Sequence, residues 1–586
     1  MRGDALLAVE DLTVEFRSRT GIVRAVDGVS FCIPRGKVVA LVGQSGSGKT
    51  VTALSLLRLV PAPGRIVAGS VVCDGRDLLR IPVDELRAFR GRRIAMIFQD
   101  PLPALHPAMR VGMQVAEAYR AHRRAALDEA RRAAGGFLSL VGLPSERDAA
   151  GAYPHELSSG ERQRALIAMA LAGGADLLVA DEPTTALDAT LRRDILDRLL
   201  QLCRERGLAI LLITHDLGIV AGAADDVLVM REGRIVESGP ASELLCRPRH
   251  PHTAHLIEAA RSLERDPPQP STVGKPLLQL ESISKRFASP PIQALDDVSL
   301  SVREAEVMAL VGEFGSGKTT LAKVALRLLE PTAGRVLFGT TDLTRLSVRS
   351  LRPLRRHIQM IFADAAAALD PRRSALSAAA ESLDALGIGS RGERQGRAAA
   401  ALDEVQLSRD AATRRPHQLS GGQRQRVGLA RALAPGPRLV IADEPVSSLD
   451  VSTQAQLIEL LLDLQRRERL ALLLISHDLR VVRRIANRVA VMYRGRIVEL
   501  SPAAELYRDA LHPYTQALLS AIPTLDPQRG SFAGFPPKPS GMAAPTAGCP
   551  FQPRCPVTDK PQACFDERPR LREVRPGRSV ACHVAR

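Results

Sequence analysis

Short apolar runs alternate with longer amphipathic segments along most of the chain. Runs such as VVALVG from Val38 and DLLVADEP from Asp176 are rich in aliphatic residues, and segments with helical periodicity follow them. The longest fully apolar runs, Leu208–Ile213 and Leu470–Ile475, have the length of buried strands. Because buried strands that alternate with helices form parallel sheets covered by those helices, the pattern predicts an α/β fold.

The same series of segments occurs twice, in the same order. LSSGERQRALIAMAL from Leu157 and LSGGQRQRVGLARAL from Leu419 lie 262 residues apart, and the DEP and HD segments recur at the same offset. Between the halves lies RDPPQPSTVGKP, whose prolines and small polar residues favour an extended linker. The predicted domains are 1–264, a linker at 265–276, 277–530, and a Cys-containing C-terminal extension at 531–586.

The net charge of +16 could indicate a nucleic acid or an anionic membrane surface as partner. We favour a simpler interpretation, because only 8 of the 80 basic residues are lysine and the arginines are scattered rather than clustered with aromatic residues. We therefore expect no nucleic-acid partner. The rarity of lysine also draws attention to Lys49 and Lys318, which occupy equivalent positions in two glycine-rich loops.

Those loops, GQSGSGKT and GEFGSGKT, match the phosphate-binding pattern G-x-x-x-x-G-K-[ST], and each lies between an apolar run and a helical segment. Backbone N–H groups of such a loop surround phosphate oxygens at a helix N-terminus. The lysines would neutralise β- and γ-phosphate oxygens, and the hydroxyls of Thr50 and Thr319 would bind Mg²⁺. The predicted ATP-binding residues of the loops are Gly43, Ser45, Gly46, Ser47, Gly48, Lys49, Thr50 and Val51, and Gly312, Gly315, Ser316, Gly317, Lys318, Thr319 and Thr320.

Adjacent carboxylates end a later apolar run in each half. Asp181 and Asp443 are predicted to bind Mg²⁺ through water, and Glu182 and Glu444 to polarise the attacking water. Such carboxylates can also act as helix caps. His215 and His477 follow the next apolar run and would contact the γ-phosphate. A lone histidine is more often structural, but the shared 262-residue offset favours the functional interpretation.

The loop, the LSxGxRQR segment, the ADEP segment and the HD histidine together resemble the nucleotide-binding domain of ABC ATPases, over nearly the whole of both halves. AMIFQDPLPALHP around Gln99, and HPHTAHLIEA and HPYTQALLSA after each domain, resemble the ATPases of dipeptide/oligopeptide importers. The resemblance implies that Gln99 contacts Mg²⁺ or the lytic water. It also implies adenine stacking on Phe16 and Phe287, although core packing is an equally good explanation of these two aromatic residues.

In this family two such domains dock head to tail, so that each ATP lies between one loop and the signature segment of the other domain. One site would combine Lys49 with Ser420, Gly421, Gly422 and Gln423, and the other would combine Lys318 with Ser158 and Gly160. The second of these sites departs from the pattern at Ser159 and Glu161, and again at Ala363, which replaces the expected glutamine. We therefore expect faster hydrolysis at the Lys49 site.

The resemblance implies the energising subunit of an importer, a peripheral protein on the cytoplasmic face of the bacterial inner membrane. Its partners would be two integral-membrane permease subunits and an extracytoplasmic substrate-binding protein. A tandem ABC ATPase acting on ribosomes or nucleic acid is an alternative, but such proteins usually have a long charged linker. An exporter ATPase is a further alternative. Asp4 and Glu10 do not fit a secretory signal, and no run reaches the roughly 20 apolar residues of a membrane span.

Four of the eight cysteines lie in the extension, with the spacing C-x5-C-x8-C-x17-C at Cys549, Cys555, Cys564 and Cys582. Clustered thiolates favour a soft metal centre, and the absence of a C-x2-C pair fits a zinc ribbon poorly. CPFQPRCP resembles the C-terminal extension of peptide-importer ATPases, some of which carry a [4Fe-4S] cluster. That resemblance implies such a cluster here, with zinc or unligated thiols as alternatives.

Overall fold

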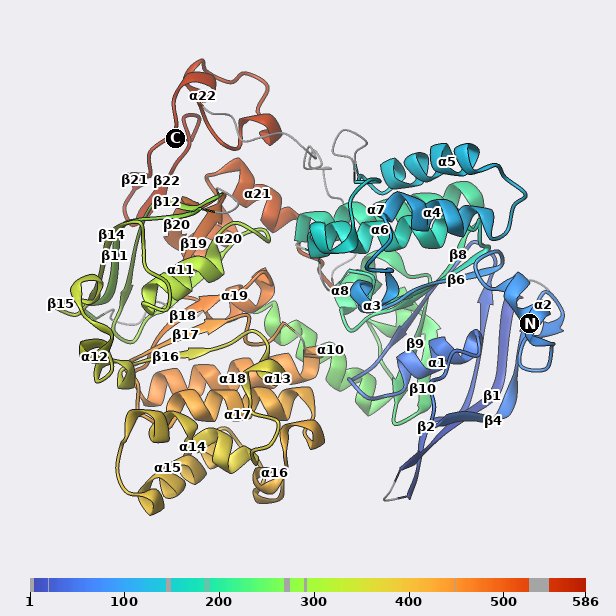
Figure 1. Cartoon of the computed structure of the whole chain (residues 1–586), viewed down its shortest axis with the longest axis horizontal. Coiled ribbons are helices and arrows are strands. Elements are labelled where there is room, and N and C mark those ends of the chain that lie inside the picture. Colours follow the sequence, from blue (N-terminus) through green and yellow to red (C-terminus); the bar gives the residue numbers. More distant parts are fainter. Residues whose placement is uncertain are drawn as a thin grey trace. The chain divides into compact units, whose positions relative to one another are not determined.

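The computed structural model describes residues 5–18, 21–143, 149–184, 187, 189–267, 274–288, 292–447, 449–525 and 547–585 (Figure 1). Most of the predicted linker and the beginning of the predicted extension lie outside these residues. The chain divides into two compact units: unit 1 runs to Ala260 and also takes the segment that begins at Pro523, and unit 2 comprises Arg261–Ile522 and the residues from Ala544 on. The described residues of the C-terminal extension, 547–585, belong to the second unit.

Unit 1 contains, among the described residues, a six-stranded sheet in the order β10-β9-β3-β8-β7-β6 and a four-stranded antiparallel sheet in the order β2-β1-β4-β5. The central strand β3 lies between β8 and β9, with Leu41 opposite Ile213 and Leu228. All five residues of β3 are buried, as the apolar run VVALV predicts for a parallel strand covered on both faces. The strands are β1 (Ala5–Ser18), β2 (Gly21–Pro34), β3 (Val38–Val42), β4 (Gly64–Cys73), β5 (Arg76–Asp77), β6 (Ile94–Ile97), β7 (Leu177–Asp181), β8 (Ala209–Ile213), β9 (Asp226–Arg231) and β10 (Arg234–Pro240).

The helices of unit 1 follow the buried strands along the chain, in agreement with the predicted α/β class. Side chains of α4, α5 and α6 pack with those of β6 and β7 in one hydrophobic core, and α1 packs with both sheets in a second core. The helices are α1 (Lys49–Leu56), α2 (Val83–Phe89), α3 (Pro101–Ala104), α4 (Val111–Arg120), α5 (Leu127–Leu140), α6 (Ser159–Ala172), α7 (Ala189–Arg206), α8 (Leu217–Ala223), α9 (Ala241–Leu244) and α10 (Pro251–Leu263).

Unit 2 repeats this plan and extends it. Its main sheet has, within the described residues, eight strands in the order β16-β17-β18-β13-β19-β20-β22-β21, and its antiparallel sheet has the order β12-β11-β14-β15. The last two strands of the main sheet come from the C-terminal extension. The strands are β11 (Pro276–Phe287), β12 (Ile292–Arg303), β13 (Val307–Val311), β14 (Ala333–Phe338), β15 (Thr341–Asp342), β16 (Ile358–Ile361), β17 (Leu439–Asp443), β18 (Ala471–Ile475), β19 (Arg488–Tyr493), β20 (Arg496–Pro502), β21 (Arg572–Arg575) and β22 (Arg578–Val580).

The helices of unit 2 again lie between the strands in the chain. In Figure 1, α14, α15 and α17 form a helical layer at one end of this unit, and α17 and α18 run beside the strands β16 to β18. The helices are α11 (Lys318–Ala325), α12 (Val348–Leu351), α13 (Ala365–Ala368), α14 (Ala375–Leu386), α15 (Arg391–Glu404), α16 (Arg409–Thr413), α17 (Gly421–Leu433), α18 (Val451–Arg467), α19 (Leu479–Ile485), α20 (Ala503–Arg508), α21 (Pro513–Ser520) and α22 (Ala563–Asp566).

The C-terminal extension is integrated into unit 2. Strand β22 pairs with β20 in antiparallel register, with Val580 opposite Glu499. Arg578 is 2% exposed, and its guanidinium lies 3.5 Å from a carboxylate oxygen of Asp509. Phe551, 1% exposed, packs in an aromatic cluster with Tyr493 and Tyr514. Strand pairing, ion pairs and aromatic packing therefore hold the extension in place.

Candidate functional site

The two glycine-rich loops share one backbone geometry. Each follows a buried strand, β3 or β13, and leads into a helix that begins at the lysine, α1 or α11. Gly43 and Gly312 have φ values of 155° and 151°, and a Cβ at either position would lie 2.2 Å from the carbonyl oxygen of Met230 or Met492. Only glycine fits at these two positions, because a side chain would collide with the backbone of the neighbouring strand. Val51 and Thr320 lie in the first turn of the following helix.

The loop lysines lie inside the curve of their own loops. Lys49 Nζ donates hydrogen bonds to the carbonyl oxygens of Gly43 and Gln44, each at 2.8 Å. Lys318 Nζ donates likewise to Gly312 at 2.7 Å and Glu313 at 2.8 Å. Helix N-termini favour anions, so each loop combines an ammonium group with backbone N–H donors at the position that a phosphate needs.

The carboxylates at the ends of β7 and β17 are buried. Asp181 is 1% exposed and Asp443 is 4% exposed, and burial raises the pKa of both, that of Asp181 to about 6. Asp181 Oδ1 has no hydrogen-bond partner among the described residues. The Thr319 hydroxyl donates to Asp443 at 3.4 Å. A buried carboxylate oxygen beside a loop threonine is the donor set that Mg²⁺ prefers, so these residues fit the predicted ion.

Glu182 and Glu444 follow the buried aspartates in an unusual backbone conformation. Their φ values are 47° and 51°, in the left-handed region, which costs free energy for a residue other than glycine. Backbone hydrogen bonds of 2.9 Å to Ile213 and Ile475 hold them there. The strained backbone therefore lies at the two glutamates that the sequence predicts to polarise water.

The surroundings of these glutamates differ between the units. In unit 1, Gln99 Nε2 donates to Glu182 at 3.1 Å, and His215 Nδ1 lies 3.1 Å from the other carboxylate oxygen. In unit 2, His477 Nδ1 lies 2.7 Å from Glu444, and the residue equivalent to Gln99 is Ala363, which has no polar side-chain atom. The structure thus brings Glu182, His215 and Gln99 together, and Glu444 with His477.

The signature segments form helix N-termini. Ser158 and Ser420 cap α6 and α17, where their hydroxyl oxygens accept hydrogen bonds from the backbone N–H of Glu161 and Gln423. The side chains of Glu161 and Gln423 in turn accept a hydrogen bond from the backbone N–H of the capping serine, so they perform the same capping role. Glu161 additionally accepts a hydrogen bond from the Ser158 hydroxyl at 2.7 Å.

The third and fourth residues of each LSxGxRQR segment, which follow Ser158 and Ser420, differ in the space that a side chain would have. A Cβ on Gly421 would meet Leu449 at 3.7 Å, an ordinary contact, and Ser159 at the equivalent position accepts a hydrogen bond from Arg162 at 3.1 Å. Gly422 and Gly160 are tighter, because a Cβ there would approach Thr453 to 2.6 Å or Leu191 to 3.0 Å. The pairing of each loop with the signature of the other unit stays a prediction.

Comparison with known proteins shows the family to which the chain belongs. The family pattern described as "ABC transporter" matches residues 26–185 and 295–447, which include the glycine-rich loop, the signature segment and the carboxylate pair of each unit. The chain belongs to the ABC transporter family. A second pattern, "Oligopeptide/dipeptide transporter, C-terminal region", matches residues 236–287 and 498–564. It covers the histidine-proline segments that the sequence analysis singled out.

Full-length relatives support the same assignment. The chain is 42% identical over 563 residues to the glutathione import ATP-binding protein GsiA of Salmonella choleraesuis (strain SC-B67), with 89% of this chain and 90% of the relative covered. It is 41% identical over 567 residues to GsiA of Escherichia coli O6:H1, with the same coverage. This chain is therefore the ATP-hydrolysing subunit of an ABC importer with two nucleotide-binding domains. No helix among the described residues is both long and apolar enough to cross a bilayer.

The second unit has an aromatic residue at its loop that the sequence analysis did not identify. Phe314 occupies the position of Ser45, and its ring lies 5.4 Å from that of His477 and 5.9 Å from Lys318 Nζ. The signal was available in the sequence, because GQSGSGKT and GEFGSGKT differ at only two positions. The second loop is therefore more apolar beside its lysine than the first.

The aromatic residues predicted to stack on adenine lie at the ends of β1 and β11. Phe16 is partly buried against the core, and its ring atoms lie close to Gly64. Phe287 is 39% exposed and lies 5.5 Å from Lys285 Nζ. Phe16 therefore has a packing role, and its contact with adenine stays a prediction, as does that of Phe287.

The four cysteines of the extension are placed in one region but not as a metal centre. Burial raises the pKa of Cys549 to about 11 and raises the pKa of Cys555 and Cys564, and each of the three lies in the electrostatic field of Cys582. The described residues contain no group of three or more His, Cys, Asp or Glu side chains arranged to hold a metal ion. The structure does not support the predicted [4Fe-4S] cluster, and the extension has other anchors.

Proposed function

We propose that the chain energises an importer of small peptides of the glutathione class. Relatives named as glutathione import ATP-binding proteins are 41–42% identical to it over 89% of its length. The importer would contain two integral-membrane permease subunits and an extracytoplasmic substrate-binding protein. The chain would be bound to the cytoplasmic face of the bacterial plasma membrane as a peripheral protein.

The observation that carries this proposal is the match of the peptide-transporter C-terminal region at residues 236–287 and 498–564, after the ABC transporter pattern in each half. The test is ATP turnover by the full complex in proteoliposomes, with the binding protein loaded with glutathione, a dipeptide or a longer peptide. We expect the largest stimulation with glutathione. No stimulation by any peptide would contradict the proposed substrate class. A double variant with Lys49→Ala and Lys318→Ala gives the background rate of ATP turnover in this assay.

We further propose a role for each residue around the first loop. Lys49 and the loop N–H groups bind the β- and γ-phosphates of ATP. Thr50 and Asp181, together with Gln99, would hold Mg²⁺, which neutralises charge on the phosphates. Glu182 accepts a proton from the attacking water, and His215, 3.1 Å from Glu182, contacts the γ-phosphate. Lys318, Thr319, Asp443, Glu444 and His477 have the same roles at the second loop.

We propose that the two units hydrolyse ATP at different rates, with unit 1 faster. The amide of Gln99 donates to Glu182 and orients its carboxylate toward the water, whereas Ala363 provides no donor for Glu444. Both glutamates and both histidines are present, so the second site retains its proton acceptor and binds ATP. Its main contribution would be to hold nucleotide.

Matched variants test this difference. Glu182→Gln is expected to lower ATP turnover of the assembled importer by about 100-fold, the lower range for loss of a general base. Glu444→Gln is expected to lower it by less than about tenfold, because the slower site carries less of the flux. Equal losses would contradict the proposal. ATP binding by both variants, measured by equilibrium dialysis, provides the control for folding.

A further inference from the structure

The C-terminal extension reaches the phosphate-binding loop of unit 2. Arg554 lies at the end of a short 3-10 helix, Gln552–Arg554, and donates to both carboxylate oxygens of Glu313, at 3.0 and 2.8 Å. Side-chain exposure is 4% for Arg554 and 5% for Glu313. The two residues are 241 positions apart in the chain, and Glu313 is the second residue of GEFGSGKT.

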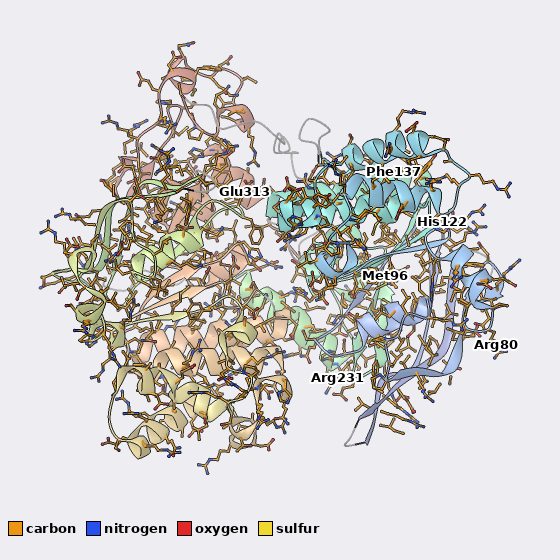
Figure 2. All side chains as sticks on the ribbon, in the orientation of Figure 1. Arg80, Met96, His122, Phe137, Arg231 and Glu313 are labelled. Carbon is orange, nitrogen blue, oxygen red and sulfur yellow. The ribbon has the colours of Figure 1, made fainter. Side chains whose placement is uncertain are left out.

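Glu313 connects three parts of unit 2. Its carbonyl oxygen accepts the hydrogen bond from Lys318 Nζ at 2.8 Å, and its backbone N–H donates to the Tyr514 hydroxyl at 2.9 Å. Its carboxylate binds Arg554. A displacement of Glu313 would therefore move a partner of the lysine that binds phosphate. Figure 2 labels Glu313 on the ribbon of this unit.

The arginine is held firmly. Phe551, three residues before it, is 1% exposed and packs on Tyr493, Tyr514 and His512. The Arg554 guanidinium lies 5.8 Å from the Phe551 ring and 6.0 Å from the Tyr493 ring. Burial lowers the pKa of Arg554, but its hydrogen bonds and charge interaction with Glu313 outweigh this and raise the pKa above its ordinary value. The guanidinium therefore stays charged.

The negative charge of Glu313 explains why the second loop is paired with Arg554. A carboxylate next to a phosphate-binding loop repels a nucleotide, and a buried carboxylate without a partner is strongly destabilising. Arg554 neutralises Glu313 through a bidentate pair, the geometry for which arginine is best suited. The first loop has the neutral Gln44 at the equivalent position, and His252 replaces Tyr514 in the HPxT segment. The first loop therefore needs no such arginine.

We propose that Arg554 is a positioning residue of the second ATP site: through Glu313 it fixes the loop carbonyl that Lys318 contacts, and it cancels a negative charge beside the phosphates. The extension thereby determines how tightly the second site holds ATP and leaves the first site unaffected. This inference rests on ATP binding by the family and is independent of the proposed difference in hydrolysis rates.

The test measures binding of radiolabelled ATP with Mg²⁺ by equilibrium dialysis. A Lys49→Ala background isolates the second site. Arg554→Met, which keeps an apolar side chain over Phe551, is expected to weaken second-site binding by about tenfold or more, since it leaves a buried carboxylate unpaired. Adding Glu313→Gln, which copies Gln44, is expected to restore affinity to within about threefold, because the charge is gone. First-site binding in a Lys318→Ala background is the control and should not change.

Rescue separates positioning from a purely structural role. If Arg554→Met leaves second-site affinity unchanged, or if Glu313→Gln fails to restore it while the melting temperatures of the variants agree, the proposal is overturned. A parallel loss at the first site would also overturn it. If Arg554→Met does not fold, Arg554→Lys decides: it keeps the positive charge but cannot make the bidentate pair, so second-site affinity should fall by at least about threefold, and an unchanged affinity would overturn the proposal.

Discussion

In unit 1 the carboxylate of Glu182 accepts a hydrogen bond from Gln99 and lies beside His215, whereas in unit 2 Glu444 lies beside His477 and Ala363 replaces the glutamine. The backbone beneath these side chains is nearly the same, with φ values of 47° and 51° at the two glutamates. The comparison shows that close packing fixes the scaffold of an ATP site, while a few side chains are free to change its chemistry.

The surroundings of the lysines differ in a second way. Lys49 lies in a loop with the neutral Gln44 and the small Ser45, and Lys318 lies in a loop with Glu313 and Phe314. The two changes in unit 2 are supported by its own neighbours, because Arg554 pairs with Glu313 and His477 packs against Phe314. Glu313 and Phe314 of the second loop thus make an ion pair and a ring contact that have no equivalent among the described residues of unit 1.

The largest expected effect tests the shared scaffold. Gly48→Ala and Gly317→Ala should each destabilise their unit by about 3 kcal/mol or more, because φ is 105° or 106° and the new Cβ would lie 2.2 or 2.6 Å from a backbone carbonyl. Calorimetric unfolding measures the loss. Gly46→Ala and Gly315→Ala, with positive φ but no atom within 4 Å of the Cβ, should cost only about 1 kcal/mol. A large effect in one unit only would contradict a common scaffold.

The buried aspartates predict a pH dependence of Mg²⁺ binding. Burial raises the pKa of Asp181 to about 6, so this carboxylate is ionised above that pH and increasingly protonated below it. A protonated carboxyl is a poor Mg²⁺ ligand, and the Mg²⁺ concentration for half-maximal ATP binding should rise by about tenfold per pH unit below pH 6. Asp443, whose pKa is also raised by burial, should behave likewise. Mg²⁺ binding by ATP alone in the same buffers is the control, and equal pH profiles with and without protein would refute the assignment.

Exchanging the residue beside the glutamate sharpens the comparison. Gln99→Ala should lower ATP turnover by about tenfold, because Glu182 loses the hydrogen bond that orients it. Ala363→Gln in a Glu182→Gln background should raise the residual turnover severalfold. If the inserted glutamine has no effect on the second site, the missing amide is not what slows it.

The smallest expected effect concerns Phe314. Phe314→Ser, which copies Ser45, should weaken second-site ATP binding by about two- to fivefold in a Lys49→Ala background, since a partly exposed ring near an ammonium contributes about 0.5–1 kcal/mol. The reverse change, Ser45→Phe in a Lys318→Ala background, should alter first-site binding by a similar factor. A change of more than tenfold in either would show that the ring has a larger role.

The sequence was sufficient for the α/β class, the two loops and the carboxylate pairs, because these depend on local patterns: an apolar strand, glycines at fixed spacing and a charged residue at a strand end. Arg554 could not be found in this way. It lies in the CPFQPRCP segment, but its partner is 241 residues earlier in the chain, and nothing in the sequence pairs the two. The difference between Gln44 and Glu313 is visible in the sequence, but it does not say which residue pairs with the glutamate.

The extension shows a second limit of sequence reasoning. Four clustered cysteines and the resemblance of CPFQPRCP led to the prediction of a metal centre in the extension. The segment instead adds β22 to the edge of the main sheet and inserts Phe551 into an aromatic cluster of unit 2. Strand pairing at a sheet edge depends on backbone groups, so the sequence of a three-residue strand such as Arg578–Val580 does not reveal it.

Single-turnover hydrolysis by the unmodified chain in its assembled importer tests the inequality of the two sites most directly. The complex is loaded with two labelled ATP molecules per chain, Mg²⁺ is added, and the reaction is quenched with acid at successive times. The account predicts two phases of equal amplitude, with one ATP hydrolysed at least about tenfold faster than the other, and loss of the fast phase in Gln99→Ala. Hydrolysis of both ATP molecules in a single phase would contradict it.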